Sequence, residues 1–107
     1  HVLMTVGQRL RAAVRRDDLI ARISGDEFDV VLVGVHNDDQ VEHLAEKLRT
    51  ELSRPVVVDD VPVGVTVSIG AVLARPDEDA VSLLARADAA LYEAKQSGRD
   101  RVVVKRD

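Results

Sequence analysis

The sequence predicts a single α+β domain in which helices pack against a central sheet. Apolar residues recur at helical spacing in three separate segments, and short runs rich in Val, Ile and Leu lie between these segments. The two kinds of segment follow the order helix, strand, strand, helix, small hairpin, strand, helix, strand. With 107 residues, 46% of them hydrophobic, the chain is large enough to enclose one core.

Bulk composition excludes several classes of protein. A formal net charge of −4 argues against a general binder of nucleic acid or anionic membranes, because such proteins carry a basic excess. The absence of cysteine rules out disulfides and thiolate metal sites, and fits a reducing compartment. No apolar run approaches the roughly 20 residues needed to cross a bilayer, so we expect no membrane contact by this segment. The two aromatic residues, Phe28 and Tyr92, are too few for stacking on single-stranded nucleic acid and are predicted to be core residues.

The first half of the chain predicts one helix and two strands. Apolar residues at spacings of three and four indicate an amphipathic helix up to about residue 16, and no capping residue precedes it. A short strand is expected over residues 19–23. The next, over residues 28–35, is apolar on both faces apart from Asp29, so it should be central and covered on both sides.

The middle of the chain predicts a helix, a small hairpin and a long strand. Asn37 begins a segment with cap chemistry, and Pro55 ends the helix that follows it. Residues 56–58 and 61–63 flank two aspartates like the arms of a hairpin. Residues 64–74 alternate as a strand, with the odd-numbered residues on one face. The stripe of the helix consists of Val41, Leu44, Ala45, Leu48 and Leu52.

The last quarter of the chain predicts a capped helix and a final strand. Residues 75–79 form a loop that ends in capping residues, and Gly98 is placed to close the helix with a left-handed cap. Residues 102–104 make the strand. Asp88 falls near the apolar stripe of this helix, so we expect it to accept hydrogen bonds or to pair with a basic side chain.

One segment has no explanation in a plain hydrophobic core. Residues 24–28, Ser-Gly-Asp-Glu-Phe, place two carboxylates beside a glycine between two strands. Neighbouring side chains of a strand point to opposite faces, so Asp26 and Glu27 can share a site only if the chain bends there. A hairpin tip with acids and free amides suits a metal-bound phosphate, although aspartate is also common in solvated turns.

Two further pairs of charged residues allow two interpretations each. Lys95 and Arg99 lie four residues apart at a helix end, where cations also stabilise the negative helix terminus. Arg15 and Asp18 form an Arg-x-x-Asp pattern five residues before the turn begins, and such a pattern also arises as a simple charge cluster.

Three segments in register resemble the GGDEF domains, whose active members are diguanylate cyclases. They are the Ser-Gly-Asp-Glu-Phe segment, Val-Thr-Val-Ser-Ile-Gly at residues 65–70, and residues 87–101 with Ala-Asp-x-Ala-Leu-Tyr-x-Ala-Lys. The resemblance implies the nucleotide-cyclase and polymerase-palm sandwich, a ferredoxin-like fold with an antiparallel-rich central sheet and helices. By the same resemblance the family's first strand and helix are absent, and residues 1–107 are the C-terminal three-quarters of one domain.

The resemblance also assigns roles to these residues. The domain would condense two GTP molecules into cyclic di-GMP and two pyrophosphates, with Mg²⁺ or Mn²⁺ as cofactor. Serine replaces the first glycine of the family motif, and its side chain would intrude near the nucleotide or donate to a phosphate. The implied residues are Asp26 and Glu27 for catalysis and metal binding, Ser24 and Gly25 against the nucleotide, and Lys95 and Arg99 on the β- and γ-phosphates.

Regulation and assembly are implied in the same way. Arg15 and Asp18 match an inhibitory site for the product, cyclic di-GMP. The resemblance implies a homodimer in the bacterial cytoplasm, controlled by an upstream sensor domain, possibly tethered to the membrane by upstream segments, and in some members joined to an EAL domain. The 107 residues alone are expected to be inactive, since one metal ligand and the guanine contacts are missing. The alternative is a degenerate module that binds GTP or cyclic di-GMP and regulates a neighbouring domain without catalysis.

Overall fold

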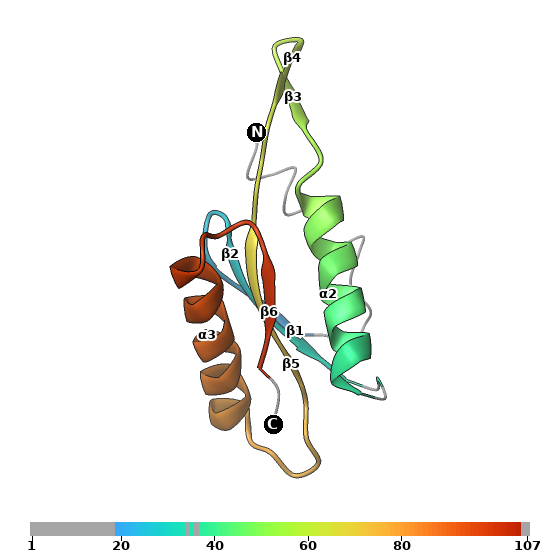
Figure 1. The fold of residues 1–107 in the computed structure, drawn as a ribbon, viewed down its shortest axis with the longest axis vertical. Coiled ribbons are helices and arrows are strands. Elements are labelled where there is room, and N and C mark those ends of the chain that lie inside the picture. The colour runs from blue at the N-terminus through green and yellow to red at the C-terminus, as the bar shows by residue number, and fades with distance from the viewer. Residues whose placement is uncertain (1–18, 34, 36, 106–107) are drawn as a thin grey trace.

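The computed structural model describes residues 19–33, 35 and 37–105, and within this part it shows two helices, a four-stranded sheet and a separate hairpin (Figure 1). The predicted helix over residues 1–16 lies outside the described residues. The sheet contains β1 (Leu19–Ser24), β2 (Glu27–Leu32), β5 (Ser68–Leu73) and β6 (Val102–Val104) in the order β1-β2-β5-β6.

The described sheet is mixed. Strands β1 and β2 pair antiparallel across a tight turn, whereas β2–β5 and β5–β6 are parallel. The α+β class is confirmed, but the expected predominance of antiparallel pairing is not found among these strands. The physical reason is the connections: α2 (Asp38–Leu52) and α3 (Ala80–Gln96) lie between successive strands and return the chain to the same end of the sheet.

The two helices cover opposite faces of the sheet, as Figure 1 shows. Helix α2 begins at the predicted cap, Asn37, whose side chain accepts a 2.8 Å hydrogen bond from the Gln40 N–H. Its apolar stripe packs on one face of β2 and β5, and α3 packs on the other face. All six residues of β2 are buried, which confirms that this strand is central. The main core joins Val41, Ala45, Leu48 and Leu52 of α2 to Phe28, Val30, Leu32, Ile69 and Ala71 of the sheet.

Helix α3 lies very close to the sheet because small residues face each other. An added Cβ on Gly70 of β5 would lie 2.2 Å from the Leu91 backbone nitrogen and 2.4 Å from the Ala87 carbonyl oxygen. The face of α3 that meets the sheet consists of Ala87, Ala90, Leu91 and Ala94. Tyr92 points away and is 63% exposed, so the prediction that it is a core residue was wrong, whereas Phe28 is fully buried.

Gly70→Ala is expected to destabilise the domain by about 3 kcal/mol or more, because the atoms in conflict belong to the backbone of α3 and cannot rotate away. Gly64→Ala is the matched control, since nothing lies within 4 Å of its added Cβ. Urea unfolding of both variants measures the effect. Equal midpoints for the two variants would show that α3 does not sit this close to β5.

The small hairpin of β3 (Val56–Val58) and β4 (Val61–Val63) confirms the predicted pair of arms, and it protrudes from the body of the domain (Figure 1). Asp59 and Asp60 form its tip, both with positive φ. The long strand predicted over residues 64–74 is shorter in the structure, since β5 begins only at Ser68. In the part of the chain that the structure describes, neither helix is both long and apolar enough to span a membrane.

Candidate functional site

The acidic segment forms the turn between β1 and β2. Ser24 pairs with Glu27, so Gly25 and Asp26 are the two residues of the turn, and the register shifts between Arg22 and Ser24. The Ser68 N–H of β5 donates a 2.8 Å hydrogen bond to the Asp26 carbonyl oxygen. The turn is thereby fixed to the central sheet, and its two acids separate: Asp26 is exposed, whereas Glu27 is only 6% exposed.

The basic pair lies at the end of α3, where the helix closes in a Schellman motif. Gly98 adopts φ +122° and its N–H donates to the Lys95 carbonyl oxygen, while the Arg99 N–H donates to the Ala94 carbonyl oxygen at 2.9 Å. The left-handed cap predicted at Gly98 is therefore present. It reverses the chain directly after the helix and turns Arg99 back over the sheet, with φ +61°.

These two segments meet at Glu27. Arg99 Nη1 donates to Glu27 Oε2 at 2.8 Å, and Lys95 Nζ lies 3.5 Å from Glu27 Oε1. Each carboxylate oxygen thus faces one cation, although Glu27 and Arg99 are separated by 72 positions in the sequence. The guanidinium hydrogen bond lowers the pKa of Glu27 more than burial raises it, and the Ser24 hydroxyl and Lys95 lower it further.

The structure therefore brings together Ser24, Glu27, Lys95 and Arg99. Gly25 lies in the turn beside them, and no contact joins the Asp26 carboxylate to the two cations within the described residues. Arg15 and Asp18 lie outside the described part of the chain.

Sequence reasoning missed residues that support this site. The sequence gives Ser68 no role beyond its place in the segment 65–70, yet it is 1% exposed and contacts both the acidic turn and the loop after α3. Arg49 of α2 reaches the same loop through Asp100, at 2.8 Å. The one available signal was Ser68 itself, a polar residue in the middle of the strand expected over residues 64–74.

A second acidic pair joins β2 and α3 and consists of the buried Asp29 and the exposed Asp88. Asp29 is 2% exposed, and its Oδ1 atom has no hydrogen-bond partner. Burial, and then the neighbouring Asp88, raise the pKa of Asp29 to about 8. Among the described residues Asp88 pairs with no basic side chain; the close approach of α3 at Gly70 sets it beside Asp29, and its hydrogen bond with that carboxyl group fits the other half of the expectation.

The described residues fit a divalent ion bound together with phosphate, but not an ion held by protein alone. Within them, no group of three or more His, Cys, Asp or Glu side chains gathers at one point. Mg²⁺ is commonly held by one or two carboxylates plus substrate phosphates and water. Glu27 and Asp26 would supply carboxylates of that kind, and Lys95 and Arg99, which contact Glu27, would supply cations for the phosphates.

The fold and the site define a class: an α+β domain with an acidic turn fixed beside a basic helix end. The sequence model described as "Diguanylate cyclase, GGDEF domain" matches residues 1–101. The chain belongs to the GGDEF family.

Relatives with known names cover nearly the whole chain. It is 39% identical over 112 residues to the probable diguanylate cyclase DgcT of Escherichia coli, covering 98% of this chain and 24% of DgcT. It is 40% identical over 100 residues to MucR of Pseudomonas aeruginosa, named a bifunctional diguanylate cyclase/cyclic di-GMP phosphodiesterase, covering 92% of this chain and 14% of MucR. The chain thus spans a quarter or less of these two relatives.

Among solved structures, the GGDEF domain of DgcB from Caulobacter crescentus, in complex with c-di-GMP, resembles this fold with a TM-score of 0.74 and 30% sequence identity. The match covers 97% of this chain and 63% of that one. The resemblance noted from three sequence segments is therefore confirmed at the level of the family and the fold.

Proposed function

We propose that this chain is the catalytic part of a diguanylate cyclase, which condenses two GTP molecules into cyclic di-GMP and two pyrophosphates. One observation carries the proposal: the buried Glu27 carboxylate lies between Lys95 and Arg99 at a turn that is fixed to the sheet. A carboxylate beside two cations offers a metal ligand or base together with a binding site for a polyphosphate. Membership of the GGDEF family supports the same activity.

In the proposed reaction the 3′-oxygen of one GTP attacks the α-phosphorus of the other. A P–O bond to the 3′-oxygen forms, the P–O bond to pyrophosphate breaks, and a carboxylate of the turn accepts the 3′-hydroxyl proton. A second, identical step closes the ring. Lys95 and Arg99 bind the β- and γ-phosphates and stabilise the charge that develops on the pyrophosphate.

The contacts of Glu27 imply that its ion-pair partners must change when GTP binds. Its two oxygens now accept from Arg99 and Lys95, so the cations must turn towards the phosphates when GTP binds. Asp26 and Glu27 would hold Mg²⁺ or Mn²⁺, which would neutralise phosphate charge and activate the nucleophile. Gly25, without a side chain, leaves the turn open to a phosphate group.

One such site cannot bind both GTP molecules, so the active form is a homodimer in which two sites face each other. Arg15 and Asp18 form the proposed inhibitory site for cyclic di-GMP, supported by the c-di-GMP complex of the related DgcB domain. We further propose a bacterial cytoplasmic location and control by a sensor domain. Activity needs a complete domain, including the first strand that this family places ahead of the segment equivalent to residues 1–16.

A specific observation favours the alternative of a binding module without catalysis. Ser24 replaces the first glycine of the family motif, and its hydroxyl hydrogen bonds to Glu27 and helps to lower the pKa of that carboxyl. The hydroxyl would therefore compete with a metal ion for the Glu27 carboxylate. The relative MucR is named as bifunctional, so one protein of this kind combines a diguanylate cyclase with a cyclic di-GMP phosphodiesterase.

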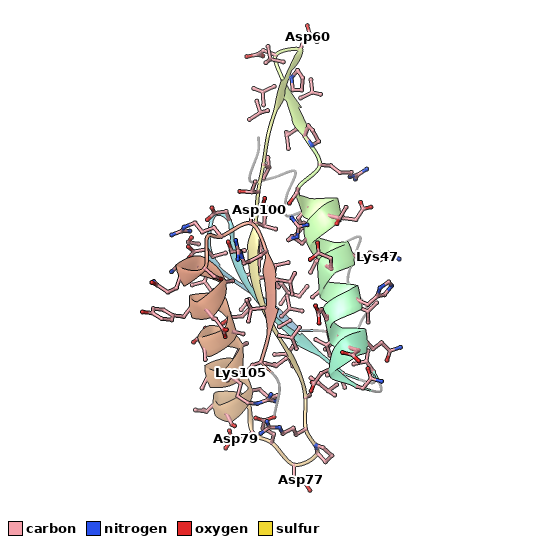
Figure 2. The ribbon with its side chains drawn as sticks, viewed as in Figure 1. Lys47, Asp60, Asp77, Asp79, Asp100 and Lys105 are labelled. Carbon is pink, nitrogen blue, oxygen red and sulfur yellow. The ribbon has the colours of Figure 1, made fainter. Side chains whose placement is uncertain are left out.

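Incubation of the complete protein with GTP and Mg²⁺ tests the proposal, with cyclic di-GMP measured by chromatography. Product is expected, and Arg99→Ala should reduce its rate about 100-fold, because charge-assisted hydrogen bonds contribute about 1.5–3 kcal/mol each. Lys105→Ala is the matched control, an exposed cation beyond β6 and far from Asp100 in Figure 2. GTP binding without turnover would overturn catalysis in favour of the module.

A further inference from the structure

Ser68 bonds both to the acidic turn and to the loop after α3. Its N–H donates to the Asp26 carbonyl oxygen at 2.8 Å, and its hydroxyl oxygen accepts from the Asp100 N–H at 3.2 Å. It is 1% exposed, at the first position of β5. The two halves of the site are therefore joined through one buried residue, whose backbone N–H holds the turn and whose hydroxyl holds the loop.

The loop that Ser68 contacts has an unusual backbone. Gly98, Arg99 and Asp100 have φ values of +122°, +61° and +48°, so three consecutive residues are left-handed and two of them carry side chains. Such a conformation costs about 1–2 kcal/mol per non-glycine residue and persists only where neighbouring groups hold it. The position of Arg99 thus depends on contacts made by the residues after it.

Those contacts come from two elements, β5 and α2. The Ser68 hydroxyl accepts from the Asp100 backbone, and the Ile69 N–H donates to the Arg101 carbonyl oxygen at 2.9 Å. From the opposite side, Arg49 of α2 donates to the Asp100 carboxylate at 2.8 Å, and Glu46 orients the Arg49 guanidinium by hydrogen bonds. Figure 2 shows Asp100 at the end of the sheet, between the two helices.

We propose that Ser68, together with the Arg49–Asp100 ion pair, positions the Arg99 guanidinium against Glu27 and later against the substrate phosphates. Lys95 lies on α3 itself, whereas Arg99 lies beyond the helix end: its N–H bonds to Ala94 of α3, and the residue after it, Asp100, is held by Ser68 and Arg49. Loss of Ser68 or Arg49 therefore displaces Arg99 selectively. The link also makes α2 a part of the site, although none of its side chains reaches Glu27. The part of this inference that concerns the substrate phosphates rests on the proposed function. The part that concerns the Glu27–Arg99 contact does not.

Ser68→Ala tests the positioning role in two measurements. The first is an NMR titration of the Glu27 side-chain carboxyl without nucleotide, in which the variant should show a pKa nearer to the ordinary value for glutamate because Arg99 is displaced. The second is GTP affinity and turnover in the complete protein, with an expected loss of about tenfold in kcat/KM. Asp100→Asn should retain more function than Asp100→Ala, because asparagine tolerates the left-handed backbone.

Ser82→Ala is the matched control. Ser82 lies at the other end of α3, where its hydroxyl donates to Glu78, so the variant also loses a serine hydrogen bond but should leave the titration of Glu27 unchanged. Arg49→Ala provides a second variant if Ser68→Ala does not fold, because Arg49 is partly exposed. An unchanged Glu27 titration in both variants would overturn the inference. A wild-type protein without turnover would overturn the proposed function alone, since the titration needs no substrate.

Discussion

Glu27→Gln is expected to reduce cyclic di-GMP formation by the complete protein by about 10²–10⁴-fold, the range for loss of a positioned general base or an equivalent charged group. Glutamine keeps the shape of the side chain but removes the charge, so it accepts no proton and binds a divalent ion weakly. Glu27 is buried between Lys95 and Arg99. No other carboxylate of the described residues contacts these two cations.

The same substitution should have the opposite effect on binding without metal. In the wild type Glu27 competes with phosphates for Arg99 and Lys95, at 2.8 and 3.5 Å. Removing that competitor should tighten metal-free GTP binding severalfold, as calorimetry in EDTA can measure. Glu93→Gln, an exposed position of the same helix, is the control for both experiments. Weaker metal-free binding by Glu27→Gln would show that the ion pairs do not compete with the nucleotide.

The free energy of unfolding of the wild-type domain is expected to depend on pH through Asp29, and Asp29→Asn is expected to abolish that dependence. Burial and Asp88 raise the pKa of Asp29 to about 8, far above its ordinary value of 3.8. Between these values the folded protein keeps a proton that the unfolded chain has lost. Stability therefore falls as pH rises through this window, by up to about 1.4 kcal/mol per pH unit, and levels off above pH 8.

The groups around Asp29 support a raised pKa and therefore a stability that falls as pH rises. Its neighbours across the sheet are Ala21 of β1 and Gly70 of β5, which carry no charge, and the group that acts on it from α3 is the like-charged Asp88. Thermal unfolding at pH 5, 6, 7 and 8 measures the slope. The curve for Asp29→Asn should be flatter than that of the wild type, and Asp88→Asn should move the loss to lower pH.

Asp60→Asn is the control for this experiment, because Asp60 lies at the far tip of the β3–β4 hairpin, at the top of Figure 2, and asparagine tolerates its positive φ. Its pH profile should match the wild type. Parallel profiles for the wild type and Asp29→Asn would mean that Asp29 is ionised in the folded protein at neutral pH.

Local signals predicted most of the described elements. The caps at Asn37 and Gly98 and the stripe of α2 are encoded within a few residues, and each is found in the structure. The bounds of β5 were less predictable, because residues 64–67 alternate like a strand yet do not belong to the sheet. The error at Tyr92 has a simple cause: the sheet-facing side of α3 consists of three alanines and Leu91, and the large aromatic ring of the helix lies outside it.

By itself the sequence determined the family, the types of element and the residues of the acidic turn and the basic helix end. It did so because capping, hydrophobic periodicity and short motifs depend on neighbours close along the chain. Only the tertiary structure decided that β5 lies parallel to β2, that Asp29 is buried against Asp88, and that Ser68 joins the turn to the loop holding Arg99. These features depend on contacts between segments tens of residues apart, and such contacts follow from how the helices and strands pack, which no local pattern records.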